Sequence, residues 1–254
     1  MKRVIAAMMI LVMALSMSGC KISYWDGLSK SEAKELVLNM LEEKYGEEFV
    51  VKNMYTPGGT GYNTPSDLRA DCSPKYDENI LFSAQIFPAG KKYTMDDTYI
   101  QSIVRQEIRE IVEPVLEKHY NKFAFEIKVD GLNNQYDSGI RVAKEATIKN
   151  YSEAIPETNQ THIWIALNNN EIKFQDELYK MVEELTTDFC LINAIIDIYY
   201  ANDDVINECV NKINSSADRL KVYGILSGKF PCDTFIFVGN KKENKLNQVE
   251  FANK

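Results

Sequence analysis

The hydrophobic pattern opens with an unbroken apolar run of twelve residues, Val4–Leu15, behind the basic residues Lys2 and Arg3. Twelve residues are too few for a membrane-spanning helix, which needs about 20, and such a run is typical of a secretory signal. No later apolar run reaches the length of a membrane span. The pattern therefore predicts that residues 1–19 are a signal segment and that the remaining chain is exported.

After the signal segment, apolar residues change between the spacing of helices and that of strands. A first helix is predicted between a capping box at Ser29 and Glu32 and a helix-ending Gly46. The strongest helical pattern places apolar residues on one face over 100–116. Other helices are predicted over 147–154, 174–189 and 203–213, and strands over 49–55, 68–73, 79–87, 123–129, 163–167, 192–200 and 235–238.

The helix over 100–116 has a predicted cap and an interruption. Asp96 or Asp97 supplies the cap, and Pro114 removes one backbone N–H, which predicts a kink. A polar, turn-rich stretch over 132–139 then marks a seam between two halves. The predicted fold class is α+β, with antiparallel sheets packed by long amphipathic helices in two subdomains. The predicted division is 1–19 signal segment, 20–28 lipidated tether, 29–131 N-terminal subdomain, 132–240 C-terminal subdomain and 241–254 polar tail.

Composition describes an ordinary globular protein with an acidic balance. Hydrophobic residues make up 45% and charged residues 26% of the sequence, as in folded domains. Loss of Lys2 and Arg3 with the signal segment changes the net charge from −8 to −10. An acidic protein repels nucleic acid unless it has a local basic patch, and only small lysine clusters occur, at 91–92 and 241–245. We therefore expect no nucleic-acid partner.

Cys20, the residue directly after the predicted signal segment, is predicted to carry a lipid. Met17-Ser18-Gly19-Cys20 resembles the lipobox of bacterial lipoproteins, where the cysteine thiol takes a diacylglyceryl group and the signal is cut just before it. The usual pattern has Leu, Val or Ile where this chain has Met17. Two acyl chains on Cys20 suffice for anchoring, at about 0.8 kcal/mol per buried methylene. The expected location is the extracytoplasmic face of the cell membrane, and Lys21 favours a Gram-positive envelope; the alternatives are an ordinary secretory signal or an uncleaved anchor.

The other four cysteines form an even set in an oxidising compartment. Cys190, Cys209 and Cys232 are the candidates for a disulfide, in which Cys190 pairs with either of the other two. Cys72 is distant in sequence and is expected to be a lone buried thiol. The alternative for all four is that they are small buried residues. Their spacing lacks the close pairs of a zinc site, so we expect no bound metal.

No residue pattern predicts a catalytic or cofactor site. His119 ends the long helix, where a cation is favourable, and His162 opens a strand. The nucleophile pattern Gly-x-Ser-x-Gly is absent. Adjacent acidic pairs such as Asp203-Asp204 point about 100° apart on a helix, so capping and solvation explain them. The glycine-rich stretch over 58–61 lacks the Lys-Ser/Thr of a phosphate-binding loop.

Tyrosine is the one residue type in notable excess, with fourteen copies. Five copies fall in or near predicted loops, where amphipathic rings are common in binding surfaces and equally common at the rim of a core. These five are Tyr55, Tyr62, Tyr76, Tyr93 and Tyr136. The excess therefore keeps a binding role open without locating it.

The helix-to-strand corner Glu43-Lys44-Tyr45-Gly46-Glu47-Glu48-Phe49 resembles that of a broad group of Firmicute lipoproteins and membrane-anchored proteins without an assigned function. Those proteins carry a helix ending in a Lys-Tyr-Gly-Glu-x-Phe corner, a small strand bearing a proline, and an Asp-x-Tyr helix start. The corresponding residues here are Cys72-Ser73-Pro74 and Asp96-Asp97-Thr98-Tyr99. The resemblance covers roughly residues 30–130, and it implies no activity, substrate or catalytic residue.

Three functions fit these observations. The first is a non-catalytic binding or interaction module at the cell surface, with a protein partner in the envelope and no cofactor. The alternative is an envelope-associated enzyme, such as a hydrolase, whose site is built by the fold and not by a motif. The third is an accessory subunit of a membrane complex. A concave pocket with converging titratable groups favours the enzyme, whereas an exposed apolar or aromatic patch favours the module.

Overall fold

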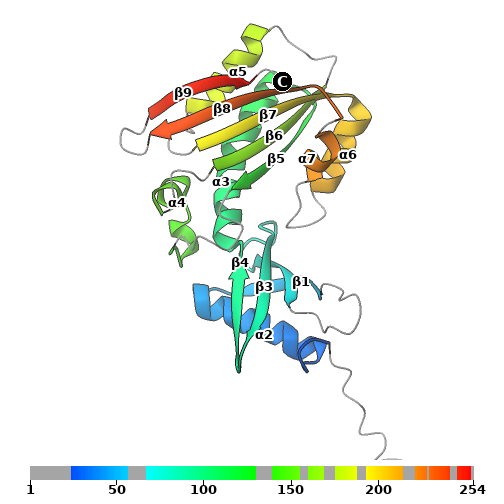
Figure 1. Cartoon of the computed structure of the whole chain (residues 1–254), viewed down its shortest axis with the longest axis vertical. Coiled ribbons are helices and arrows are strands. Elements are labelled where there is room, and N and C mark those ends of the chain that lie inside the picture. The colour runs from blue at the N-terminus through cyan, green and yellow to red at the C-terminus, as the bar shows by residue number, and fades with distance from the viewer. Residues whose placement is uncertain are drawn as a thin grey trace, which may run out of the picture.

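The computed structural model of the chain describes residues 24–56, 67–129, 139–154, 160–168, 175–187, 193–213, 221–227, 229–240 and 245–252. Two sheets follow one another along the molecule, and helix α3, Tyr99–His119, runs from the first sheet onto the second (Figure 1). The predicted α+β fold class is confirmed. The predicted signal segment and Cys20 lie outside the described residues.

The first sheet is an antiparallel meander of four strands in chain order, and it packs on a helix of its own and on the start of α3. Helix α2, Lys30–Tyr45, begins at the predicted capping box, where the Glu32 N–H donates to Ser29 Oγ and the Ser29 N–H donates to the Glu32 carboxylate. Gly46 ends the helix at φ 69°, a backbone conformation that favours glycine. The strands are β1 Phe49–Tyr55, β2 Leu68–Pro74, β3 Phe82–Ala89 and β4 Lys92–Asp97.

Strand β4 corrects the predicted start of the long helix. The structure places Asp96 and Asp97 in β4 and has Thr98 as the cap residue of α3. β4 is an edge strand without a fully buried residue, so it lacks the apolar alternation that identifies a strand in a sequence. Asp97 still stabilises the helix start, because its Oδ1 accepts the N–H of Tyr99 at 3.1 Å.

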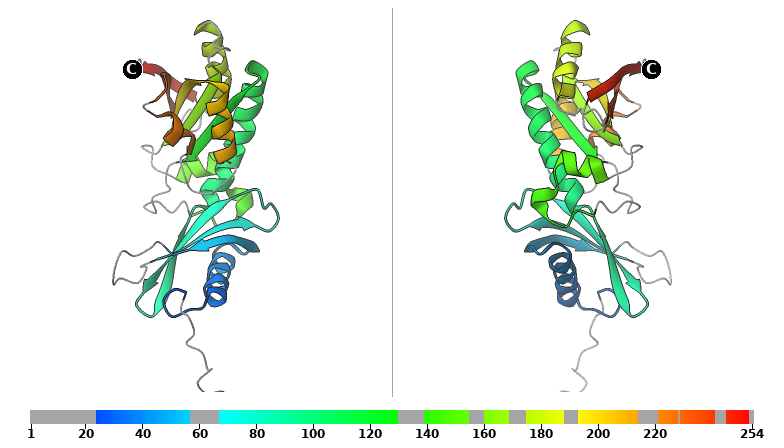
Figure 2. Two further views of the ribbon diagram at one scale, coloured as in Figure 1. Left: turned by 90° about the vertical axis from the view of Figure 1, so that its right-hand side faces the viewer. Right: turned by 90° about the vertical axis from the view of Figure 1, so that its left-hand side faces the viewer.

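The second sheet has five strands in the order β5-β6-β7-β8-β9. β6 and β7 run parallel because α5 crosses over between them, whereas the other neighbours are antiparallel. Helices α3 and α5 pack on one face, and α6 and α7 on the other (Figure 2). The remaining elements are β5 Phe123–Val129, η1 Ala143–Glu145, α4 Ile148–Ala154, β6 Gln160–Asn168, α5 Gln175–Thr187, β7 Asn193–Ala201, α6 Asp203–Ile213, α7 Lys221–Leu226, β8 Cys232–Asn240 and β9 Lys245–Ala252.

This sheet corrects two predicted boundaries. β5 precedes the predicted boundary at residue 131 but pairs antiparallel with β6, so it belongs to the second sheet. β9 lies within the predicted polar tail 241–254 and pairs with β8 as the fifth strand. In both cases the pairing between strands determines which sheet the segment joins. Local composition encodes such pairing only weakly. Most of the predicted seam, 132–138, lies outside the described residues.

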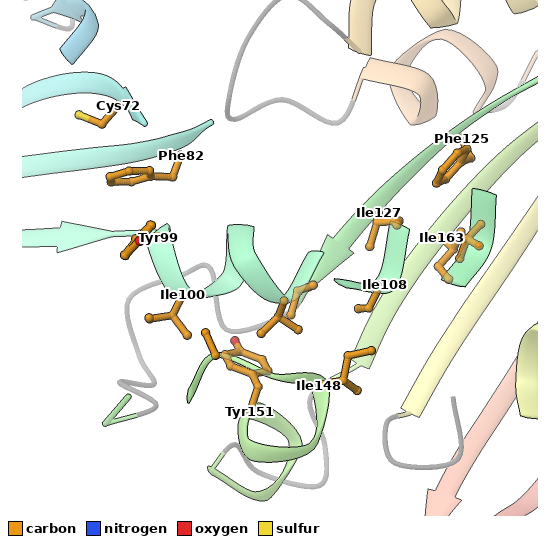
Figure 3. Packing of buried hydrophobic residues seen from close by; sticks show 14 of the residues in the cluster. Cys72, Phe82, Tyr99, Ile100, Ile108, Phe125, Ile127, Ile148, Tyr151 and Ile163 are labelled. Atoms are coloured by element: carbon orange, nitrogen blue, oxygen red, sulfur yellow. The ribbon is translucent and has the colours of Figure 1, made fainter. Parts of the chain in front are cut away.

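One hydrophobic core runs through both sheets along α3. Figure 3 shows Phe82 and Tyr99 at the first sheet, and Ile108, Phe125 and Ile163 further along the same cluster. Each of these five side chains is at most 3% exposed, and full burial of such a side chain contributes roughly 1.5–3 kcal/mol. The helix continues through its internal proline to its last turn. The two sheets are therefore joined by a shared core.

The first described residues pack on the body of the protein. The hydroxyl of Tyr24 donates to the carbonyl of Met54 at 3.0 Å. Trp25 is 2% exposed, and its ring centroid lies 5.4 Å from that of Tyr93. The structure therefore shows that both rings pack on the body of the protein. No described helix is long and apolar enough to cross a membrane.

Candidate functional site

An open hollow of about 760 Å³ lies where three segments meet, and we call it the corner hollow. Its walls are the corner between α2 and β1, the turn after β2, and η1 with the residue before it. The lining residues are Glu47, Glu48, Lys75, Tyr76, Val142, Ala143 and Lys144. The volume falls within the range of about 300–1,000 Å³ that is usual for small-ligand sites.

Glu47 joins the three segments that build the hollow. Its Oε2 accepts the hydroxyl of Tyr99 at 2.7 Å, which ties the corner after α2 to the start of α3. Its Oε1 accepts the N–H of Ala143 at 3.2 Å, which ties the same corner to η1. Hydrogen bonds to a charged acceptor are stronger than neutral ones. A single carboxylate thus holds the wall formed by η1 against the first sheet.

The second hydroxyl at the hollow belongs to Tyr76. Its oxygen lies 3.3 Å from that of Tyr99. Tyr99 has one hydroxyl proton, which it donates to Glu47, so Tyr76 is the donor in the contact between the two tyrosines. The oxygen of Tyr76 then keeps its acceptor capacity for a group that enters the hollow.

Asp97 also stabilises the corner between α2 and β1, because it binds the last two residues of α2. Its Oδ2 accepts Lys44 Nζ at 2.7 Å, and its Oδ1 accepts the Tyr45 hydroxyl at 2.6 Å. The Asp97 side chain is fully buried, whereas that of Lys44 is 27% exposed. Because a buried polar group is costly without partners, these bonds and the one from the Tyr99 N–H satisfy both oxygens of the buried carboxylate.

Aromatic rings fill the space beneath these polar contacts. The Tyr99 ring lies 4.9 Å from the Tyr45 ring, 5.0 Å from Phe49 and 4.9 Å from Phe82, measured between centroids. Edge-to-face and tilted pairs at these distances add to the free energy of burial. Tyr99, which binds Glu47, is therefore packed by three aromatic rings.

Burial keeps both tyrosine hydroxyls protonated. Burial raises the pKa of Tyr99 far above its ordinary value, and the hydrogen bond to Glu47 raises it further. Burial also raises the pKa of Tyr76, although its ring is largely exposed. Both hydroxyls are protonated near neutral pH, as ordinary tyrosines are, and the direction of their contact follows from the bond that Tyr99 donates to Glu47.

The hollow is also where exposed apolar groups gather. Among the described residues, four large hydrophobic side chains are exposed: Tyr76 at 62%, Val142 at 36%, Val210 at 40% and Tyr223 at 39%. Two of them, Tyr76 and Val142, line the corner hollow. Exposed aromatic and apolar groups that face one concave surface are typical of binding sites.

The two histidines lie elsewhere. His119 Nε2 is 3.2 Å from a carboxylate oxygen of Glu184, which also accepts Lys118. The ring of His162 stacks on Trp164 with centroids 5.6 Å apart and an angle of 16° between the planes. Neither is among the described residues that line the hollow.

The structure leaves the predicted disulfide untested. Cys209 and Cys232 are free thiols, as is Cys72, and Cys190 lies outside the described residues. Burial raises the pKa of Cys209 and of Cys232 to about 11, and it raises that of Cys72 well above its ordinary value. A raised pKa lowers the fraction of each thiol that is ionised at neutral pH. A bond from Cys190 stays a prediction.

Within the described ranges, no three side chains of His, Cys, Asp or Glu are grouped so that they could hold a metal ion. The carboxylates at the hollow are also engaged: Glu47 accepts two hydrogen bonds, and Glu48 Oε2 accepts Lys75 Nζ at 2.6 Å. The glycine-rich stretch over 58–61 lies outside the described residues.

Part of this site is signalled by the sequence. Tyr76 belongs to the loop tyrosines, and Glu47 belongs to the corner whose sequence resembles that of a group of Firmicute lipoproteins. That corner meets the Asp-x-Tyr helix start in space, since Lys44 and Tyr45 bind Asp97. Val142 and Lys144 have no such signal, because their place at the hollow depends on how η1 packs.

Comparison with known proteins identifies a similar fold. No protein-family model matches the chain, and no curated protein matches it. Among solved structures, the chain is similar to the 2.55 Å crystal structure of a DUF5037 family protein from Ruminococcus gnavus. The TM-score is 0.60 with 18% sequence identity, over 85% of this chain and 95% of that chain. This likeness shows the fold, and it agrees with a family whose function is unknown.

Proposed function

We propose that this chain is a membrane-anchored, extracytoplasmic lipoprotein that acts as a non-catalytic binding module, with the corner hollow as its binding site. The observation that carries the proposal is the exposed side chain of Tyr76 in a hollow that Glu47 also lines. Glu47 is held in place there by its hydrogen bond from Tyr99. A rigid aromatic ring supplies contact area at low entropic cost, and tyrosine is enriched in interfaces.

The described lining residues favour binding over catalysis. None of them is Ser, Cys or His, so the usual pair of nucleophile and base is missing from this part of the site. The carboxylate of Glu47 already accepts two hydrogen bonds that position the walls. A group held in this way is better suited to structural support than to proton transfer.

The short tether supports a position next to the membrane. With an anchor at Cys20, only residues 21–23 separate the lipid from Tyr24, which already binds Met54. Four residue steps span at most about 14 Å. The first sheet is then held beside the bilayer. The source of the similar crystal structure, a Firmicute, supports a Gram-positive envelope.

Recovery of a partner from membranes tests the proposal. The tagged, anchored chain is solubilised in mild detergent, and the bound components are compared for wild type, Tyr76→Ala and Tyr223→Ala. Tyr223 is the control because it is also exposed but lies on α7, away from the hollow. We expect a component that wild type and Tyr223→Ala recover and Tyr76→Ala does not. Equal recovery by all three variants, or no component across repeats, contradicts the proposal.

A further inference from the structure

The turn between β3 and β4 carries two lysines at its tip. Ala89 at the end of β3 pairs with Lys92 at the start of β4, so only Gly90 and Lys91 form the turn. Gly90 has a φ of 67°, which glycine adopts without strain. Residues 88–92 are all exposed, and neither lysine forms an ion pair with another described residue. The turn therefore presents two ammonium groups to its surroundings.

Two contacts hold the hairpin of β3 and β4 against the first described residues. The hydroxyl of Tyr93 donates to Asp26 Oδ2 at 2.9 Å, and the Tyr93 ring centroid lies 5.4 Å from that of Trp25. Figures 1 and 2 show the turn at the same end of the molecule as the start of α2, away from the second sheet. With an anchor at Cys20, at most about 14 Å of backbone separates the lipid from Tyr24. The turn is then held close to the bilayer.

The lysines of the turn decide the sign of the charge at this end. Residues 24–32 contain one lysine and two acidic residues, whereas residues 88–92 contain two lysines and no acidic residue. The two segments together therefore have one positive charge, and without the lysines of the turn they would have one negative charge. The exported chain as a whole has a net charge of −10. An anionic surface thus repels most of the body and attracts this turn.

We propose that Lys91 and Lys92 bind the anionic headgroups of the bilayer in which the chain is anchored, which makes the β3–β4 turn a second membrane contact. The inference rests on the lipid anchor of the proposed function and concerns a surface separate from the corner hollow. Attraction of basic residues to an anionic bilayer falls off within a Debye length, about 8 Å at physiological ionic strength, so it depends on the short tether.

The contact is electrostatic and orients the protein. None of the four large hydrophobic side chains that are exposed among the described residues lies in the turn, so the turn has no large apolar group to insert between the lipids. The acyl chains supply the affinity for the membrane. The two lysines then determine which end of the first sheet faces the bilayer.

Amine footprinting on bilayers of two compositions tests the inference. The acylated chain is purified, its acyl chains are verified by intact mass, and it is reconstituted into nanodiscs of phosphatidylcholine or of an equal mixture with phosphatidylglycerol. Acetylation of each lysine is followed by mass spectrometry. We expect Lys91 and Lys92 to react about fivefold more slowly on the mixed discs, the factor that corresponds to the attraction of one lysine to an anionic bilayer. Lys149, an exposed lysine on α4, should react equally on both.

Matched variants assign the effect to the turn. Lys30, the exposed first residue of α2, reports the orientation, and in the wild-type chain it should also react more slowly on the mixed discs. The double variant Lys91→Gln/Lys92→Gln should abolish this protection of Lys30. The control is Lys149→Gln/Lys180→Gln, which removes two exposed lysines on α4 and α5 and should leave the protection unchanged. Circular dichroism verifies that each variant is folded.

Three results overturn the inference. They are equal reaction of Lys91 and Lys92 on the two kinds of disc, protection that persists in about 1 M NaCl, where the Debye length is about 3 Å, and protection of Lys30 that survives in Lys91→Gln/Lys92→Gln. In each case a membrane component lost only with Tyr76→Ala still supports the proposed function. A purified chain whose mass lacks acyl chains refutes the lipid anchor, and with it both proposals.

Discussion

The hydroxyl of Tyr99 donates to the carboxylate of Glu47 at 2.7 Å across 52 residues of sequence. The bond joins the start of α3 to the corner between α2 and β1. Because the other oxygen of the same carboxylate accepts the N–H of Ala143, Glu47 also fixes the wall that η1 contributes to the corner hollow. The shape of the hollow thus depends on one side chain that is held from two sides.

Glu47→Gln should destabilise the protein. The amide retains one acceptor but loses the charge that strengthens both bonds, so we expect the free energy of unfolding to fall by about 1–2 kcal/mol. Urea titration followed by circular dichroism measures it. Glu48→Gln is the matched control, since Glu48 is exposed and pairs only with Lys75, and it should leave the midpoint nearly unchanged. Equal effects of the two changes contradict a positioning role for Glu47.

Asp97→Asn should cost more. The buried carboxylate accepts Lys44, Tyr45 and the N–H of Tyr99, and loss of its charge leaves an amino group and two donors without a full set of acceptors. We expect a loss of about 2–3 kcal/mol, measured by the same titration at pH 7. A loss below that of Glu47→Gln shows that the buried pair contributes little.

Asp96→Asn, unlike Glu47→Gln and Asp97→Asn, should not lower the free energy of unfolding at pH 7. Burial raises the pKa of Asp96, so the folded protein binds a proton at this carboxyl more readily than the unfolded chain does. For a raised pKa, the stabilisation is present below the unfolded pKa and is lost as the pH rises through the folded pKa. A neutral amide at this position should therefore be neutral or stabilising at pH 7, with a smaller dependence of the urea midpoint on pH between 4 and 7. A clear loss of stability at pH 7 contradicts this account.

The thiols of Cys209 and Cys232 should resist alkylation. With a pKa of about 11, only about 1% of either thiol is ionised at pH 9, against half of an ordinary thiol with a pKa of 9. Iodoacetamide labelling at pH 9, read out peptide by peptide in a mass spectrometer, should therefore be roughly fiftyfold slower in the folded chain than in urea. Labelling of Cys232 at the same rate in both states contradicts its burial.

Cys20→Ala tests the predicted lipid anchor. The variant should accumulate as a precursor without acyl chains, whereas the wild-type chain should have the mass of a protein that begins at a diacylated Cys20. Intact mass spectrometry of membrane fractions distinguishes the two. Normal maturation of the variant refutes the lipobox.

Local signals in the sequence predict the elements that have them. The capping box at Ser29 and the helix end at Gly46 each lie within a few residues of the structure that they specify, and both are confirmed. β4 and β9 are missed because their sequences, KYTMDD and KLNQVEFA, are largely polar and lack the apolar pattern that marks the predicted strands.

The residues of the site likewise fall into those that the local sequence marks and those that only tertiary packing places there. Glu47 and Tyr76 are marked by a motif and by a loop position. The proximity of Lys144 to them follows from the packing of 139–154 against α3, where the N–H of Ile148 donates to Glu107 at 2.5 Å. Tertiary contacts of this kind place a side chain at a site without any local signature.

Photo-crosslinking in intact cells tests the central claim that the corner hollow is the binding surface. A photoreactive phenylalanine analogue replaces Val142, which lines the hollow, or Val210, which is similarly exposed on α6. Irradiation at position 142 should yield a discrete adduct of the anchored chain on an immunoblot, and Tyr76→Ala should abolish it. Irradiation at position 210 should yield none. The same adduct at both positions, or no adduct at position 142, contradicts the account.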